Sequence, residues 1–228
     1  MELEKEGGVA SFPFVEVRRY RNKLGELHEL ESTYLYPMLK SSNVAKDDVL
    51  EPAKWMLVTQ RSVGESTTPI RDKAPRTWRY LQDHGDFLDA RKSSVYENRP
   101  RFSIFGVGEY SFAPWKVAIS GLYKKLHFVV IGSCEGKPIV LDDTCYFIPC
   151  GNRREAEYLA GLLNSEIAGQ FFEAFIFWDK KRPITAGILR RLDLTALARE
   201  LGTEDQIRAF LGSSGSSGEW RQQMRLGI

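Results

Sequence analysis

Long apolar runs are missing from this sequence of 228 residues. No stretch approaches the roughly 20 apolar residues that cross a bilayer as a helix, so we expect no membrane partner. The first residues, MELEKEGG, are acidic and polar, unlike a secretory signal peptide. Cysteine is also scarce. Cys134, Cys145 and Cys150 are an odd set without metal-binding spacing, which predicts reduced thiols in a cytoplasmic protein.

Histidine is equally rare, and His28, His84 and His127 lie far apart in the sequence. We therefore expect no zinc site built from them. The rest of the composition is that of a globular protein, since 43% of the residues are hydrophobic and can form a sizeable core. The net charge of +2 is too small to indicate a partner, so only the distribution of charge along the chain can do so.

Two glycines separated by one residue stand in FGVGEYSFAPWKV (105–117) and raise the question of a cofactor loop. Loops that bind a dinucleotide or S-adenosylmethionine place a helix N-terminus directly after the glycines. Here the following residues alternate like a strand and include Pro114, so that helix is not expected. We interpret Gly106 and Gly108 as turn residues between two strands and expect no cofactor in this chain.

Positive charge is concentrated in the middle of the chain. Residues 91–137 contain eight Lys or Arg against three Glu, so this segment carries +5, and eight aromatic residues are interleaved with the charges. Lys and Arg attract phosphates, and exposed aromatic rings pack on sugars and bases, so the pattern indicates a nucleic-acid surface. A second basic cluster follows in DKKRP (179–183). The alternative is an ordinary solvated face above core aromatics.

Hydrophobic periodicity predicts an α+β fold. We expect a mixed, largely antiparallel sheet from the first two-thirds of the chain, with helices from the last third packed on it. A hairpin is expected over 14–36, where Asn22 and Gly25 suit the turn, and Asn152 and Ser165 should cap two later helices. Other expected elements are strands at 55–60, 102–105 and 115–120, a hairpin over 126–149, and a helix over 76–94 that Gly85 weakens.

The core and the domain limits follow from the same reading. Expected core residues are Trp55, Trp78, Leu159, Leu163, Phe171 and Phe175. We expect one domain over residues 10–200, followed by a C-terminal helix and a flexible Gly/Ser tail over 201–228.

Six strings, in order and spacing, resemble a known family. They are YLYPMLKSSNV (34–44), APRTWRYLQDH (74–84), ARKSSVYENRPRFSIFGVGEYSFAPWKVAISGLYKK (90–125), LDDTCYFIP (141–149), LAGLLNS (159–165) and FWDKKRPIT (177–185). Together they resemble the C-terminal target-recognition region of N6-adenine DNA methyltransferases of the TaqI type. Many of these belong to restriction–modification systems, including fused enzymes of the Eco57I kind. The likeness runs from about residue 10 to about residue 200.

The resemblance implies a division of labour. In this family a catalytic domain lies N-terminal to the region and carries a methyl-donor loop and an (N/D/S)-P-P-(Y/F) motif that holds a flipped adenine. None of the ten prolines here is next to another, so the motif is missing from this sequence. The resemblance therefore implies a sequence-specific DNA recognition domain without catalytic residues. Double-stranded DNA and a methyltransferase domain, in cis or in trans, are the expected partners, and that domain would bind S-adenosylmethionine.

The candidate base readers lie at the start of the basic segment. Arg99 and Arg101 flank Pro100, in a loop that we expect to be stiff between Tyr96 and Phe102. An Arg fork can bind guanine O6 and N7 together. The preceding residues that we expect at the DNA are Arg91, Lys92, Ser93 and Ser94, and Asn98 can pair with adenine.

Other candidates suit phosphate contact, which needs charge but little precise geometry. Lys116 follows Trp115 in a strand-like segment and can equally be an internal structural lysine. The remaining members of this group are Lys124, Lys180, Lys181 and Arg182.

Functions of other classes stay open. One is a remnant of a methyltransferase, and another is a metal-dependent nuclease that would use Glu135, Lys137 and Asp142. However, EGK (135–137) falls in a predicted hairpin turn, and adjacent aspartates point to opposite faces of a strand. We therefore expect Asp142 or Asp143 to cap backbone groups or pair with a basic residue. The last alternative is a protein-interaction module that docks on a methyltransferase core.

Overall fold

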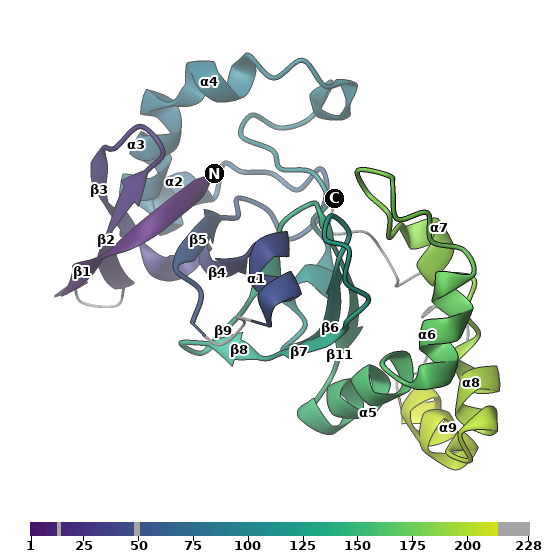
Figure 1. Ribbon diagram of the computed structural model, residues 1–228. Helices are drawn as coiled ribbons and strands as arrows, with labels where there is room; N and C mark the ends of the chain where they lie inside the picture. Colours follow the sequence, from purple (N-terminus) through teal and green to yellow (C-terminus); the bar gives the residue numbers. More distant parts are fainter. Residues whose placement is uncertain (13–14, 48–50, 214–228) are drawn as a thin grey trace. The chain divides into compact units, whose positions relative to one another are not determined.

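The computed structural model describes residues 1–12, 15–47 and 51–213 and divides into two compact units (Figure 1). Unit 1 consists of Met1–Met38 and Pro52–Phe112, and unit 2 consists of Leu39–Glu51 and Ala113–Ile228. Both combine helices with antiparallel strands, which confirms the predicted α+β class. Within the described ranges, no helix is long and apolar enough to cross a bilayer.

Unit 1 is built on a sheet in which β4, β5, β1, β2 and β3 are neighbours in this order and run antiparallel. These strands are β1 (Glu2–Phe12), β2 (Val15–Asn22), β3 (Leu27–Glu31), β4 (Leu35–Leu39) and β5 (Lys54–Leu57). The hairpin predicted over 14–36 is present as β2 and β3, but its second strand ends at Glu31. Its turn forms because Gly25 has a φ of 82° and the Asn22 side-chain oxygen accepts the backbone N–H groups of Leu24 and Glu26.

Unit 1 contains short helices where one long helix was predicted. They are α2 (Ile70–Lys73), which precedes that predicted segment, α3 (Pro75–Asp83) and α4 (Gly85–Asp89). The helix expected over 76–94 is interrupted at His84, whose φ of −106° and ψ of 14° leave the helical range, and it ends at Asp89. The start of α3 is capped from a distant strand, because the buried carboxylate of Glu31 accepts the backbone N–H groups of Arg76 and Thr77.

Residues 102–105 are irregular instead of forming the expected strand. Phe102 has a φ of 66°, in the left-handed region, and this interrupts an extended run. Its position is nevertheless fixed. The ring lies edge-on to Trp78 at a centroid distance of 5.4 Å, and the carbonyl oxygen accepts from Thr59 Oγ1 at 2.8 Å. Short 3₁₀ segments complete this unit at Ser32–Tyr34 (η1), Ser94–Tyr96 (η2) and Glu109–Phe112 (η3).

Unit 2 is built on a second sheet, in the order β11-β6-β7. Its strands are β6 (Trp115–Ser120), β7 (Val129–Ile131) and β11 (Cys145–Cys150), with β8 (Ser133–Cys134), β9 (Lys137–Pro138) and β10 (Val140–Leu141) between them in sequence. The hairpin expected over 126–149 is therefore divided, since β7 and β11 each pair with β6. A small hairpin, β8–β9, does form over the predicted turn, where Glu135 and Gly136 both have positive φ.

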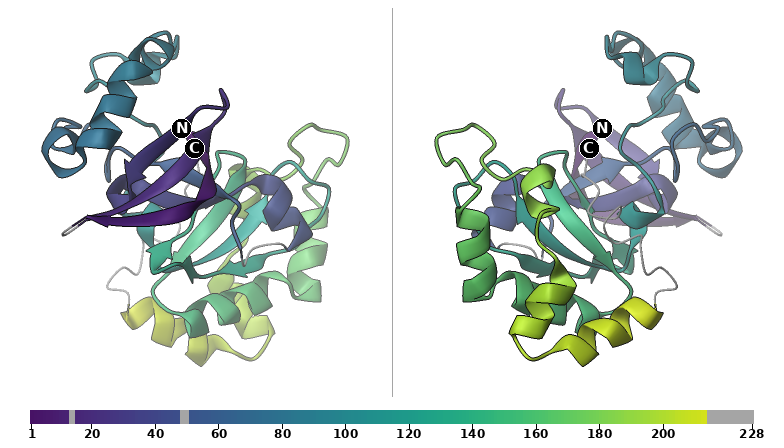
Figure 2. Two further views of the ribbon diagram at one scale, coloured as in Figure 1. Left: turned by 90° about the vertical axis from the view of Figure 1, so that its left-hand side faces the viewer. Right: turned by 90° about the vertical axis from the view of Figure 1, so that its right-hand side faces the viewer.

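The helices of the last third lie together beside this sheet (Figure 2). The helices of unit 2 are α1 (Ser41–Lys46), α5 (Arg153–Leu163), α6 (Glu166–Glu173), α7 (Ala186–Leu189), α8 (Leu194–Glu200) and α9 (Glu204–Ser213). Both predicted caps are confirmed, since the side chains of Asn152 and Ser165 accept the backbone N–H groups of Glu155 and Ala168. The predicted C-terminal helix is α9, whereas the tail from residue 214 lies outside the described residues.

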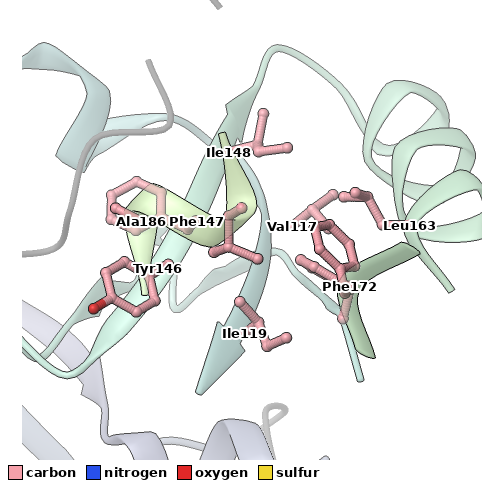
Figure 3. Close-up of a pocket in the computed structure, with 10 residues that line it drawn as sticks. Val117, Ile119, Tyr146, Phe147, Ile148, Leu163, Phe172 and Ala186 are labelled. Carbon is pink, nitrogen blue, oxygen red and sulfur yellow. The ribbon is translucent and has the colours of Figure 1, made fainter. Parts of the chain in front are cut away.

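The core of unit 2 is closely packed. Phe172 of α6 is fully buried and faces Val117 and Ile119 of β6 (Figure 3). The space left among these side chains is about 10 Å³, which is too small to hold a ligand. Of the predicted core residues, Trp55, Leu159 and Leu163 are buried, and Trp78, Phe171 and Phe175 are partly buried.

Candidate nucleic-acid interface

Unit 1 carries an open hollow of about 610 Å³, lined by residues between Leu88 and Ser103. It lies where α4 ends and the turns after η2 begin. Four basic side chains line it, and they are Arg91, Lys92, Arg99 and Arg101. The carboxylates in the lining come from Asp89 and Glu97, so the basic groups outnumber the acidic ones. The structure thus gathers most of the sequence-predicted base readers around one concave surface.

The loop that carries Arg99 is fixed at both ends. At one end the guanidinium carbon of Arg91 lies 3.8 Å from the centroid of the Tyr96 ring. At the other end Phe102 is buried, with 2% of its surface exposed. Arg91 also joins the two ends, because its Nη1 donates to the carbonyl oxygen of Ser103 at 2.7 Å. Little conformational entropy is then left for the loop to lose on docking.

The predicted residues of this loop differ in what their side chains already contact. Arg91 is engaged in the contacts just described and also donates to the Leu88 carbonyl, so it acts as a positioning residue. Arg101 donates twice to Asp89 Oδ2, at 2.7 and 3.0 Å. The other predicted members are exposed, and they are Lys92, Ser93, Ser94, Asn98 and Arg99. Asn98 has a φ of 57°, a conformation that Asn adopts more readily than most residues.

Lys116 does not lie on a DNA-facing surface. Its side chain is buried in unit 2, with 1% exposed, and Nζ donates to the Ala113 carbonyl oxygen at 2.7 Å. The prediction of a phosphate contact is therefore wrong for this residue, and the alternative of an internal lysine describes it. The sequence hides the difference, because a single lysine between Trp115 and Val117 is compatible with a surface position and with a buried one. Burial lowers the pKa of Lys116 to about 8, since the charged ammonium has lost its water.

We expect Lys116→Met to stabilise the protein at neutral pH by about 1–2 kcal/mol, which is the relieved cost of the buried charge less the lost bond to Ala113. The unfolded lysine titrates near 10.5 and the folded one near 8. Between these two pKa values the unfolded state therefore binds more protons than the folded state. The free energy of unfolding of the wild type should for this reason rise with pH over this range. Urea unfolding of both proteins at pH values below and above 8 measures this. A variant that is less stable than wild type at every pH would contradict it.

Unit 2 carries the second basic group. Lys180, Lys181 and Arg182 are all exposed, and Arg182 lies 3.8 Å from Asp143. The ammonium of Lys180 stands 5.0 Å above the ring of Phe177, which is 67% exposed. The sequence did not indicate that Phe177 is exposed, because an aromatic residue between apolar neighbours is typical of a core position. Lys124, another predicted phosphate contact, is also exposed on this unit.

The carboxylates considered for a nuclease have structural partners. Asp142 Oδ1 accepts from the backbone N–H and the hydroxyl of Thr144, at 3.0 and 2.6 Å, and Asp142 Oδ2 accepts from the backbone N–H of Ser41. Asp143 faces Arg182, as noted above. The expectation that these aspartates cap backbone groups or pair with a basic residue is thus confirmed. Glu135 and Lys137 lie in the β8–β9 hairpin, and in the described part of the chain they join no group of metal-ligating side chains.

The glycine segment differs in detail from the prediction. Gly106 has a φ of 71° and turns the chain, but Gly108 is followed by η3 and only then by the strand β6. This 3₁₀ segment has four residues, and the ring of Tyr110 lies where a Cβ on Gly108 would be. Gly108 is therefore needed for close packing of Tyr110, whose hydroxyl donates to the Gly106 carbonyl at 2.9 Å.

Comparison with known proteins shows that the chain is similar in sequence to part of a methyltransferase. Over 178 residues, which is 78% of the chain, it is 51% identical to the Type II methyltransferase M.NspV of Nostoc sp.. The match covers 37% of that protein, so the chain spans little more than a third of its relative's length. No family model matches the sequence. The chain is related to a Type II methyltransferase, as the resemblance implied.

Proposed function

We propose that this chain is the DNA target-recognition domain of an adenine-N6 methyltransferase or of a fused restriction–modification enzyme. The observation that carries the proposal is that a segment 51% identical to part of a Type II methyltransferase presents a basic hollow on a stiffened loop. Adenine specificity rests on the family resemblance. The free thiols of Cys134, Cys145 and Cys150 fit a reducing cytoplasm.

In this proposal the two basic surfaces have different tasks. The loop around Arg99 reads base edges in the major groove, because a fixed loop places a guanidinium fork accurately. Asn98 and Lys92 flank this reader, and Arg101 is available where DNA displaces Asp89. The group Lys180–Arg182 binds phosphates and so fixes register without carrying sequence information. The exposed ring of Phe177 beside it is suited to packing on a sugar or base.

The chemistry belongs to another domain in this proposal. A catalytic domain, in cis or in trans, would bind S-adenosylmethionine and hold the flipped adenine. The recognition chain itself should not bind the cofactor, because the segment directly after Gly108 is the four-residue 3₁₀ segment η3 and not an α-helix. Titration calorimetry of the chain with S-adenosylmethionine should therefore be flat, and a stoichiometric heat signal would favour the alternative of a methyltransferase remnant.

The proposal is tested with a pool of DNA duplexes, each of which contains a window of random sequence. The 228-residue chain is used at low salt to capture the duplexes that it binds. Sequencing of the bound fraction should show one short motif enriched over the input. A bound pool with the same composition as the input would contradict sequence recognition by this segment. Binding of a methyltransferase catalytic domain without any enrichment would instead favour the interaction module.

A further inference from the structure

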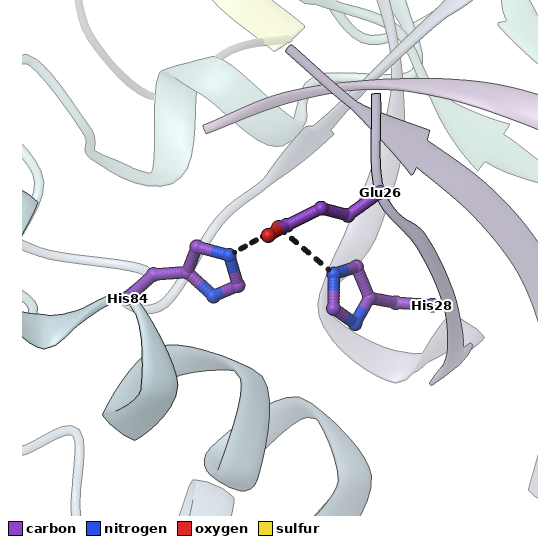
Figure 4. Close-up of side chains that lie close together, drawn as sticks. All are labelled: Glu26, His28 and His84. Atoms are coloured by element: carbon purple, nitrogen blue, oxygen red, sulfur yellow. Dashed lines mark hydrogen bonds and ion pairs between the residues drawn. The ribbon is translucent and has the colours of Figure 1, made fainter. Parts of the chain in front are cut away.

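Three side chains with metal-binding groups meet in unit 1, outside the hollow (Figure 4). Glu26 Oε2 lies 2.8 Å from His84 Nε2 and 3.4 Å from His28 Nε2. The ligand atoms of the three residues all lie within 4.8 Å of one another. Glu26 and His28 belong to the β2–β3 hairpin, whereas His84 joins α3 to α4, 58 residues away from Glu26. The sequence separation of the histidines had pointed away from such a cluster.

The hydrogen bonds of His84 show that positive charge belongs between it and Glu26. His84 Nδ1 lies 2.8 Å from the carbonyl oxygen of Tyr80, which can only accept, so Nδ1 carries the hydrogen. Nε2 then directs its remaining lone pair at the Glu26 carboxylate, which is also an acceptor, at 2.8 Å. Two acceptors approach this closely only around a proton or a cation. The Asn22 amide nitrogen, at 3.4 Å from Nε2, is too far to fill this role, and it donates to Glu26 Oε2 at 2.7 Å.

We propose that Glu26, His28 and His84 bind a divalent transition-metal ion of the Zn²⁺ class. Two imidazoles and one carboxylate are a donor set that suits Zn²⁺ and its neighbours in the first transition row, with one position left for water. The bond from His84 Nδ1 to the Tyr80 carbonyl is the outer contact that orients a metal-binding histidine.

The burial of the three side chains agrees with such a site. The His84 side chain is 10% exposed, that of His28 26% and that of Glu26 48%, so an ion would be covered on one side and open to water on the other. The ion would join the β2–β3 hairpin to the start of α4, which leads to the hollow.

Cobalt is the probe, because Co²⁺ replaces Zn²⁺ and its visible absorption reports the ligands. The tag-free, metal-stripped 228-residue chain is titrated with Co²⁺, then with Zn²⁺ in competition. We expect one ion per chain, visible d–d bands without a thiolate charge-transfer band, and a rise in Tm on loading. No uptake would show that only a proton lies between His84 and Glu26. A thiolate band would place the ion on cysteine. Either result would overturn the proposal.

Variants then locate the ion. His28→Gln and Glu26→Gln should each weaken binding by about tenfold or more, since each removes one ligand. These residues are used because His84 is buried and its replacement can unfold the unit. The matched control is His127→Gln, which changes the histidine of unit 2 beside Asp47 and should leave the affinity unchanged. Equal affinities in wild type, His28→Gln and Glu26→Gln would contradict the assignment.

Discussion

Replacing Arg99 by alanine is expected to lower the affinity for the selected duplex by about 1–3 kcal/mol and to relax discrimination at one base pair. The reason is that Arg99 is exposed on a loop held by Arg91, Tyr96 and the buried Phe102, so its fork reaches a base edge at little entropic cost. Arg101→Ala should act in the same direction but less strongly, because Arg101 must first leave Asp89.

Two further variants distinguish base recognition from phosphate binding. Lys181→Ala should weaken binding to all sequences about equally and lower the salt slope by about one unit, as expected for a phosphate contact. Arg79→Ala is the matched control, since it removes an exposed arginine of unit 1 that does not line the hollow. Affinities are measured for the selected duplex and for each single-base variant of it. If Arg99→Ala lowers the affinity for all duplexes equally, the loop binds phosphates and does not recognise bases. If Arg99→Ala does not lower the affinity, the DNA-facing surface lies elsewhere.

Glu31→Ala is expected to lower the free energy of unfolding by about 3 kcal/mol, because hydrogen bonds to a buried charge are strong and their loss leaves donors unsatisfied. The Glu31 side chain accepts the backbone N–H of Arg76, the backbone N–H of Thr77 and the Thr77 hydroxyl, at 2.7–2.9 Å. It therefore satisfies the N-terminus of α3, where the helix dipole also favours negative charge. This helix leads to His84 and α4, so its loss should also loosen the hollow.

The control is Glu29→Ala on the same strand. Glu29 is half exposed and pairs with Arg76 and Arg19 at the surface, so its removal should cost less than about 1 kcal/mol. Urea unfolding followed by circular dichroism compares the two variants with wild type. Equal losses in both would show that Glu31 contributes no more than a surface ion pair.

Local signals in the sequence predicted local structure. Asn22 and Gly25 indicated the β2–β3 turn, and Asn152 and Ser165 indicated the starts of α5 and α6, because each acts on backbone groups a few residues away. Pro100 between two aromatics likewise indicated a fixed loop. These features place the candidate reader Arg99, whose function is still a prediction.

Long-range pairing and burial could not be predicted in the same way. β1 lacks regular alternation around Gly7 and Gly8, and it is a strand because β2 and β5 pair with it. The sequence alone predicts that Glu31 is a surface residue, and it is buried because α3 packs over it. The charge on Lys116 suggested exposure, although tertiary packing buries it. His28 and His84 meet only because the hairpin and the α3–α4 junction come together.

Salt-dependent binding to duplex DNA tests the central claim most directly. Fluorescence anisotropy with the 228-residue chain and a labelled duplex of mixed sequence should give a Kd in the range of about 10⁻⁴–10⁻⁶ M. The affinity should decrease steeply as the salt concentration is raised from about 50 to about 200 mM. This result is expected because exposed Lys and Arg side chains on both units would replace counterions on phosphates. No binding at low salt, or tight binding that does not change with salt, would contradict the account.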